Sequence, residues 1–289
     1  MREYVPMVLD NEGLKRLQGV CFELACEVDR VCRKNNIEYT LESGTLIGAV
    51  REHGFIPWDD DVDVAMTREE YEKFFEACKT DLNTEKFFLQ EHRTDPEYPW
   101  GYSKLRMNGT SLVKVGQEDM RFHDGIFADI FVYDNVPDGF ISRRLHYAAC
   151  YFIRKCQYAL FGKKNEEKAA LRALYTLMDK IPKEWLFSAL DALAEKPNRK
   201  QTQLKRYYTY PFPRKECMYG IPSRCFDEYT DADFEGKPLR IVKDYDTVLS
   251  LMYGDYMTPP PPSEITYYPI SRIKFPDEQE RRENEFAFK

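Results

Sequence analysis

The sequence predicts an α+β fold, in which a mixed sheet with flanking helices is followed by a mostly helical C-terminal elaboration. Segments with helical spacing alternate with short strand-like runs up to residue 139, and turn signals separate them. Long helical stretches then continue to about Leu193. The hydrophobic share of 43%, over 289 residues, is ample for a buried core. We expect a core over residues 1–139 and an elaboration over residues 140–289, whose aromatic and proline-rich end packs back on the core.

The first elements follow from apolar spacing. Apolar residues recur every three or four positions from Asn11 to Lys34, which is typical of one amphipathic helix. The run 37–41 then indicates a strand. Ser43-Gly44-Thr45 is a turn of small residues that can open a helix over residues 46–51. The result is a strand, a turn and a helix in succession.

A second strand-to-helix junction is expected at Thr67. The run 62–66 indicates a strand, and Thr67 with Glu70 forms a capping-box pattern at the start of a helix that continues through Cys78. Turn signals bound four further predicted strands, and a later segment returns to helical spacing. These strands are Lys86–Gln90, Tyr102–Met107, Ser111–Val115 and Ile126–Tyr133, and the later helix is Tyr245–Tyr253.

Charge and apolar runs limit the partners and the location. The net charge of −7 argues against a surface built to bind nucleic acid. The longest apolar stretch, Leu145–Phe161, is interrupted by Arg154 and Lys155, so we expect no transmembrane segment. Its aromatic and basic residues suit either a packed helix or a peripheral contact with the inner face of a cell membrane. Eight cysteines without a metal-binding spacing indicate reduced thiols in a cytoplasmic protein.

The acidic run Trp58–Val64 is the most informative stretch. Side chains alternate along a strand, so Asp61 and Asp63 project from one face while Val62 and Val64 enter the core. Two carboxylates on one face repel each other unless a cation lies between them. Hard oxygen ligands suit Mg²⁺ or Mn²⁺, which would also bridge substrate phosphates. The alternative is a solvated acidic turn without a ligand.

Two neighbouring features favour the metal interpretation. Gly44 and Thr45 open a helix after a strand, where free backbone amides could hold a phosphate. Asp129 stands in an apolar strand, and an isolated acid there is costly unless it is paired or bound to a metal. Asp129 is therefore a candidate third carboxylate, with a structural ion pair as the alternative.

Basic residues near these acids are candidates for phosphate contacts. Lys104 and Arg106 share one face of a strand and suit either phosphate oxygens or a solvated sheet edge. Arg121 and His123 precede the strand of Asp129. For both residues, a contact with the donor substrate and a position in a surface loop are the two alternatives. Arg51 and His53, which flank the acidic run, share that ambiguity.

Several of these stretches resemble the LicD family of phosphocholine transferases, which is related to fukutin. The resemblance covers most of the chain, although residues 140–223 share only general similarity. It implies a nucleotidyltransferase-type fold with a catalytic core over residues 1–139. The matching stretches are Leu41–Arg51, Gly54–Asp63, Lys104–Arg106 with Thr110, Gly125–Phe131 and Tyr253–Met257.

The resemblance also implies a reaction and a set of site residues. The reaction is transfer of a phospho-substituent such as phosphocholine, dependent on Mg²⁺ or Mn²⁺, from a CDP-activated donor such as CDP-choline. The acceptor is a sugar hydroxyl of a cell-surface glycan of the lipopolysaccharide or teichoic acid type. The catalytic and metal-binding acids are Asp61, Asp63 and Asp129, and the substrate-binding candidates are Ser43, Gly44, Thr45, Lys104, Arg106, Arg121 and His123.

Two other functions remain open. A glycosyltransferase would use the same D-x-D acids to hold a nucleotide-sugar diphosphate. A non-enzymatic glycan-binding module would instead use Tyr207, Tyr208, Tyr210 and Phe212 as a stacking platform for sugar rings.

Overall fold

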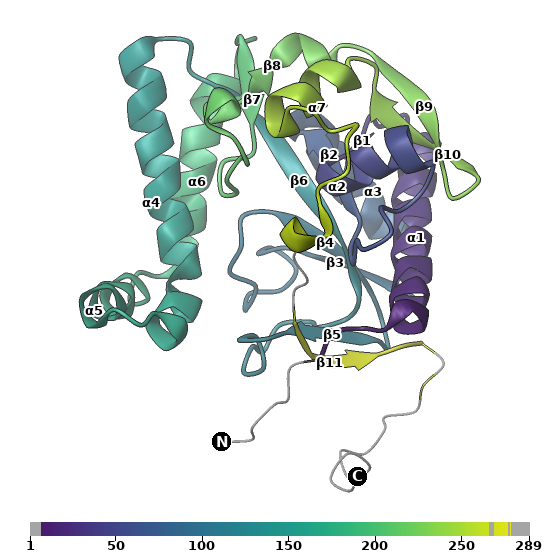
Figure 1. Cartoon of the computed structure of the whole chain (residues 1–289). Coiled ribbons are helices and arrows are strands. Elements are labelled where there is room, and N and C mark those ends of the chain that lie inside the picture. Colours follow the sequence, from purple (N-terminus) through teal and green to yellow (C-terminus); the bar gives the residue numbers. More distant parts are fainter. Residues whose placement is uncertain (1–6, 266–268, 277, 279–289) are drawn as a thin grey trace, which may run out of the picture.

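A mixed sheet forms the centre of the computed structural model, which describes residues 7–265, 269–276 and 278 (Figure 1). Strands β2 and β6 run parallel, and the other pairings in this sheet are antiparallel. The strands lie in the order β1 (Thr40–Leu41), β2 (Asp63–Thr67), β6 (Phe127–Val136), β4 (Ser103–Met107) and β3 (Phe87–Gln90). The short strands β7 (Leu204–Arg206) and β8 (Ile221–Pro222) extend it beyond the end of β6. The predicted α+β fold is confirmed.

One face of the sheet is covered by α1 (Asn11–Lys34) and α3 (Arg68–Asp81). The apolar stripe of α1 is buried from Leu17 onward, and Asp10 caps this helix by accepting the Gly13 N–H at 2.8 Å. The predicted helix over residues 46–51 begins earlier, as α2 (Ser43–Ile47), and continues as a π-helical turn (Gly48–Glu52). Helix α2 contacts β2, the strand with which the acidic run ends.

The capping box predicted at Thr67 is wrong. Thr67 is the residue before α3, but its side chain makes no capping hydrogen bond. The Glu70 carboxylate instead accepts the Glu38 N–H at 2.9 Å and pairs with Lys73 at 2.8 Å. The Glu70 carboxylate is therefore bound by Glu38 and Lys73 and does not take part in a capping box.

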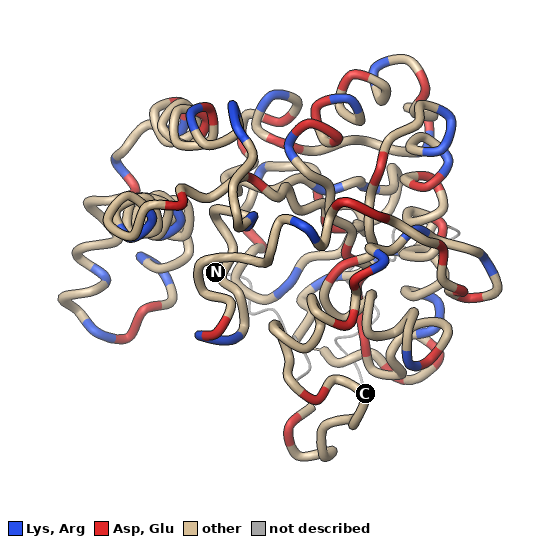
Figure 2. Tube along the Cα trace, turned by 90° about the horizontal axis from the view of Figure 1, so that it is seen from above, with Lys and Arg blue, Asp and Glu red and all other residues tan. Residues whose placement is uncertain are grey.

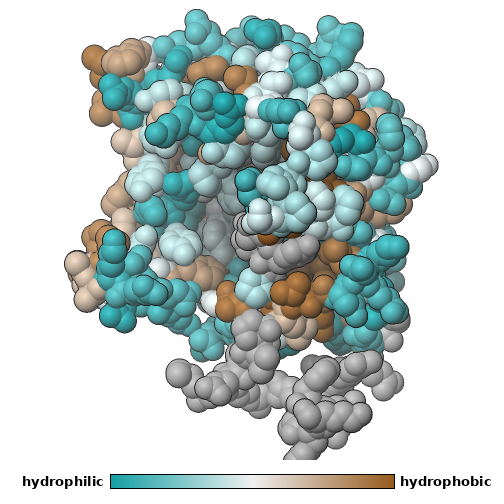
Figure 3. Space-filling view, in the orientation of Figure 1, coloured by the Kyte–Doolittle hydropathy of each residue, from teal (hydrophilic) through white to brown (hydrophobic). Residues whose placement is uncertain are grey.

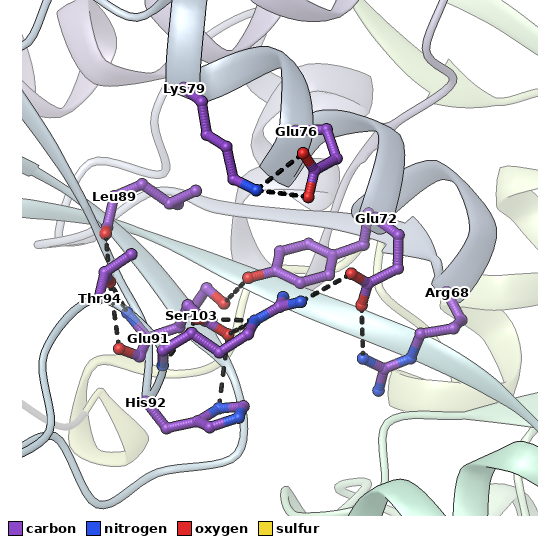
Figure 4. A network of polar contacts seen from close by, with 11 residues as sticks. Arg68, Glu72, Glu76, Lys79, Leu89, Glu91, His92, Thr94 and Ser103 are labelled. Carbon is purple, nitrogen blue, oxygen red and sulfur yellow. Dashed lines mark hydrogen bonds and ion pairs between the residues drawn. The ribbon is translucent and has the colours of Figure 1, made fainter.

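A polar network ties α3 to the edge of the sheet (Figure 4). Arg93 donates to Glu91 at 2.9 Å and to Glu72 at 2.8 Å, and Arg68 approaches Glu72 at 3.3 Å. Tyr71 and Ser103 share a further hydrogen bond between helix and strand. Since these carboxylates have cationic partners within the fold, we assign the network a structural role.

The C-terminal half contributes a helical layer and several strands. Helices α4 (Phe140–Asn165), α5 (Ala169–Met178) and α6 (Lys183–Asn198) stand at the left in both views (Figures 1 and 2). α4 packs on α6 through a separate apolar cluster, and α6 packs on β6. The remaining elements are α7 (Tyr245–Tyr253), the hairpin β9 (Tyr229–Phe234) and β10 (Lys237–Val242), and the pair β5 (Ser111–Lys114) and β11 (Ile270–Lys274).

The later segments join the main core. Val242 of β10 donates its N–H to Thr40 Oγ1 at 3.0 Å, and Tyr207, Ile241 and Met252 belong to the same apolar cluster as α1. The division at residue 139 stays a prediction.

The stacking platform that a glycan-binding module would need is not exposed. Tyr207 and Tyr208 are buried, so the four aromatic residues do not form an exposed surface together.

Two other expectations concern the cysteines and the membrane. All eight cysteines are unpaired. Among the described residues, no helix combines the length and the apolarity needed to cross a membrane.

Candidate active site

A row of charged side chains crosses the sheet at one level. Asp63 on β2 lies directly opposite Asp129 on β6, and Asp129 lies opposite Lys104 on β4. Directly paired residues project from the same face, so the three side chains are adjacent. Their neighbours Val64 and Ile130 are fully buried on the other face. The apolar residues of the strands thus fix the register that aligns the charges.

Asp61, Asp63 and Asp129 form a compact group, called here the acid cluster. One carboxylate oxygen from each lies within 4.8 Å of the others. Burial and the neighbouring carboxylates raise the pKa of Asp63. Burial also raises the pKa of Asp129, although the ion pair with Lys104 opposes this effect. The cluster is therefore electrostatically unfavourable when it is fully ionised without a cation.

Lys104 compensates only part of the negative charge. Burial lowers its pKa to about 8, although Asp129 opposes this shift. The ion pair that was the alternative for Asp129 is thus present. Asp63, in contrast, forms no ion pair with any residue that the structure describes. An all-oxygen set with uncompensated charge fits Mg²⁺ or Mn²⁺ better than a softer metal.

A second group of acids adjoins the cluster and includes a lysine that the sequence analysis missed. Asp59, Asp60 and Asp61 also bring their oxygens within 4.8 Å of one another. Lys114 Nζ, from β5, lies 3.7 Å from Asp60 and 3.8 Å from Asp61. Burial lowers the pKa of Lys114, but the surrounding acids outweigh it and raise the pKa overall. A lone lysine on a short strand carries no sequence signal of this role.

The Ser43-Gly44-Thr45 turn supports the acids. Thr45 Oγ1 accepts the Asp63 N–H at 2.9 Å, which fixes the start of β2. A Cβ on Gly44 would lie 2.8 Å from Asp59 Oδ2, so a side chain here would displace that carboxylate. Ser43 has a positive φ of 52°. The structure shows how this turn positions the acids, and its contacts with phosphate stay predictions.

Two residues beside the turn were not among the site residues predicted from the sequence. Tyr253, at the end of α7, hydrogen-bonds Ser43, and burial raises the pKa of its hydroxyl. Glu42 is buried and accepts a hydrogen bond from the Tyr133 hydroxyl at 3.1 Å. Burial raises the pKa of Glu42 to about 7. Only the resemblance to known stretches, which includes both residues, pointed toward them.

Lys104 and Arg106 are buried, so the solvated-edge alternative is wrong for both. Arg106 donates from Nε to Gln90 Oε1 and from Nη1 to the Gly125 carbonyl, both at 2.6 Å. These bonds hold the β3–β4 edge to the segment before β6.

The remaining candidates are exposed or have hydrogen-bond partners outside the acid cluster. His123 contacts Asn108 through Nε2 at 3.0 Å, and its Nδ1 accepts the Gly125 N–H at 3.1 Å. Arg51 donates to the Tyr256 carbonyl at 2.7 Å. Arg121 and His53 are exposed. Substrate contacts by these residues stay predictions.

Comparison with known proteins agrees with this geometry. Residues 36–147, which include Asp61, Asp63 and Asp129, match the nucleotidyltransferase domain of the LicD/FKTN/FKRP family. The resemblance to the LicD family noted from the sequence is thus confirmed, over these residues by the family match and over most of the chain by a relative described next.

The similarity to whole proteins extends beyond this domain. The chain is 29% identical over 265 residues to the lipopolysaccharide cholinephosphotransferase LicD of Haemophilus influenzae, covering 86% of this chain and 92% of that protein. It is also 47% identical over 146 residues to an uncharacterized protein of Rickettsia prowazekii, covering 48% of this chain and 50% of the relative. The prediction of a LicD-type enzyme is confirmed.

Proposed function

We propose that the protein transfers a phospho-substituent, such as phosphocholine, from a CDP-activated donor to a sugar hydroxyl of a lipopolysaccharide-type glycan, with CMP as the leaving group. The observation that carries this proposal is the convergence of Asp61, Asp63 and Asp129 through the parallel pairing of β2 and β6. Phosphoryl transfer depends mainly on positioning and charge neutralisation, which such a group supplies when it holds a divalent cation. The name of the Haemophilus influenzae relative supports the choline phosphate group and the lipopolysaccharide acceptor.

The residues have separable parts in this proposal. Asp61 and Asp63 would hold Mg²⁺ or Mn²⁺, which when bound neutralises charge on the donor diphosphate. Asp129 has a raised pKa because it is buried, which suits a group that accepts a proton from the attacking hydroxyl. Lys104 keeps Asp129 oriented through their ion pair. Lys114 holds the adjoining acids on the side of β5.

Product analysis tests the proposal. Purified protein would be incubated with CDP-choline labelled in the choline group, a lipopolysaccharide acceptor and Mg²⁺ or Mn²⁺, with EDTA as the metal-free comparison. We expect label in the glycan, a phosphodiester signal by ³¹P NMR, and loss of transfer in EDTA and in Asp61→Asn. Asp191→Asn, an equivalent change at an exposed position of α6, should retain transfer.

Two results would support other functions. Transfer of a sugar from a nucleotide-sugar, without phosphorus in the linkage, would identify a glycosyltransferase. Glycan binding that is unaffected by EDTA and by Asp61→Asn, with no transfer from any CDP-alcohol, would indicate a binding module.

A further inference from the structure

The outward face of α4 exposes an unusual number of large apolar side chains. Phe140, Ile141 and Leu145 are 72%, 71% and 67% exposed. Further along the same helix, Tyr151 and Phe152 are each 45% exposed. Figure 3 shows hydrophobic surface at the upper left, over the start of this helix. The exposed positions recur with helical spacing and so form a continuous face.

The opposite face of α4 explains why this surface points outward. Cys150, Ile153 and Cys156 pack against Leu186 and Leu190 of α6 in a separate apolar cluster. Because α6 in turn packs on β6, α4 is the outermost layer of the described fold on this side (Figure 1). Core packing therefore does not require Phe140, Ile141 or Leu145.

Helix α5 and the start of α6 extend the exposed apolar surface. Leu171, Leu174 and Leu177 recur every three residues on α5 and are 40%, 48% and 63% exposed. Trp185 near the start of α6 is 56% exposed. Figure 3 shows a second hydrophobic area at the lower left, where Figure 1 places α5.

The positive charge of this region indicates an anionic partner. α4 contains six Lys and Arg and no Asp or Glu, and residues 140–185 contain ten Lys and Arg against four Asp and Glu. The whole chain, in contrast, has a net charge of −7. Arg144 lies over the Phe140 ring at 5.2 Å, and Arg154 lies over the Tyr151 ring at 5.0 Å. Cations therefore stand among the exposed aromatic rings.

We propose that this face, comprising the outward side of α4 and the leucines of α5, docks the protein on the surface of an anionic lipid bilayer. Apolar and aromatic side chains would enter the boundary between headgroups and acyl chains, while Arg and Lys contact lipid phosphates. A symmetric dimer through the same face would oppose two helices that carry only positive charge, which disfavours a second copy as the occupant. The proposal is independent of the transfer reaction.

Vesicle sedimentation with the full chain tests this docking. We expect binding to vesicles that contain one third phosphatidylglycerol in phosphatidylcholine, at least tenfold weaker binding to pure phosphatidylcholine, and weakening by 0.5 M NaCl. The triple variant Phe140→Ser/Ile141→Ser/Leu145→Ser should lose at least tenfold in vesicle affinity. The pair Val8→Ser/Val115→Ser, which changes residues 60% and 45% exposed elsewhere, should bind like the wild type.

A second variant separates the charge contribution. Arg144→Gln/Arg154→Gln should weaken binding to anionic vesicles at low salt by several-fold and leave the melting temperature unchanged. This variant keeps the proposal testable if the triple variant folds poorly. Equal binding to both vesicle types, absence of binding, or variants that bind as the wild type does would overturn the proposal. A dimer in analytical ultracentrifugation that the triple variant abolishes, without vesicle binding, would assign the face to a second copy instead. Neither measurement uses a donor or acceptor, so failure of docking leaves the proposed transfer reaction untouched.

Discussion

Replacing Asp63 by Asn should stabilise the metal-free protein while it removes the response to Mg²⁺. The amide retains the shape of the carboxylate and removes one negative charge from the acid cluster. At 4.8 Å, the upper limit of the distances between the oxygens, one fully ionised pair costs about 3.5 kcal/mol for an effective dielectric constant of about 20. Asp63 faces two such partners, whereas Lys104 and Lys114 offset part of the repulsion.

We therefore expect Asp63→Asn to raise the free energy of unfolding in EDTA by about 1 to 3 kcal/mol. The wild type should gain about 2.7 kcal/mol when Mg²⁺ exceeds its dissociation constant a hundredfold, and the variant should gain much less. Turnover in the variant should fall at least a hundredfold, because the remaining acids would hold the cation poorly.

Urea denaturation in EDTA and in Mg²⁺ measures both effects without a substrate. Asp191→Asn, at an exposed site outside the acid cluster, is the matched control and should shift neither value. The electrostatic reasoning would be refuted if Asp63→Asn were less stable than the wild type in EDTA and gained as much stability from Mg²⁺ as the wild type does.

Three further changes probe the surroundings of the acid cluster. Burial raises the pKa of Glu42 from 4.5 to about 7, so the folded protein binds this proton more tightly than the unfolded chain, and stability is lost as the pH rises from about 4.5 to about 7. In Glu42→Gln, up to about 3 kcal/mol of this pH-dependent loss of stability should disappear. If the urea midpoint changed equally between pH 5 and pH 8 in the wild type and the variant, the raised pKa of Glu42 would be refuted. Lys114→Met removes the ammonium group beside the run Asp59–Asp61, so it should lower the free energy of unfolding without metal by about 1 to 3 kcal/mol. Because this ammonium group and Mg²⁺ compete for the same carboxylates, the variant should bind Mg²⁺ several-fold more tightly. Weaker Mg²⁺ binding by calorimetry would contradict this competition. Gly44→Ala should displace the Asp59 carboxylate and lower turnover at least tenfold while stability changes by less than about 1 kcal/mol, and normal turnover would show that this close contact is unimportant.

The sequence predicted those elements whose pattern depends on one buried face. The helices Asn11–Lys34 and Tyr245–Tyr253 have the predicted bounds because their apolar stripes pack directly on the core. The hairpin β9–β10 was missed because the side chains of Tyr229–Phe234 are largely polar and exposed, so the strand lacks a regular apolar alternation. Its pairing with β10 depends on contacts with α1 and β1 that are distant in the sequence.

The same distinction applies to the site. Alternation along one strand predicts that Asp61 and Asp63 share a face, and the apolar neighbours of Asp129 single it out. The position of Lys114 depends instead on β5 lying near a loop that is more than 50 residues earlier in the sequence, which no local pattern encodes.

Electron paramagnetic resonance of bound Mn²⁺ tests the central claim most directly, that the acid cluster holds a cation which contacts the donor phosphates. The wild type would be titrated with Mn²⁺, and CDP-choline with ¹⁷O in its phosphates would then be added. We predict saturable Mn²⁺ binding that Asp63→Asn abolishes, and line broadening by the ¹⁷O-labelled donor. Mn²⁺ binding that persists undiminished in Asp63→Asn, or a spectrum that the labelled donor leaves unbroadened at saturation, would contradict the account.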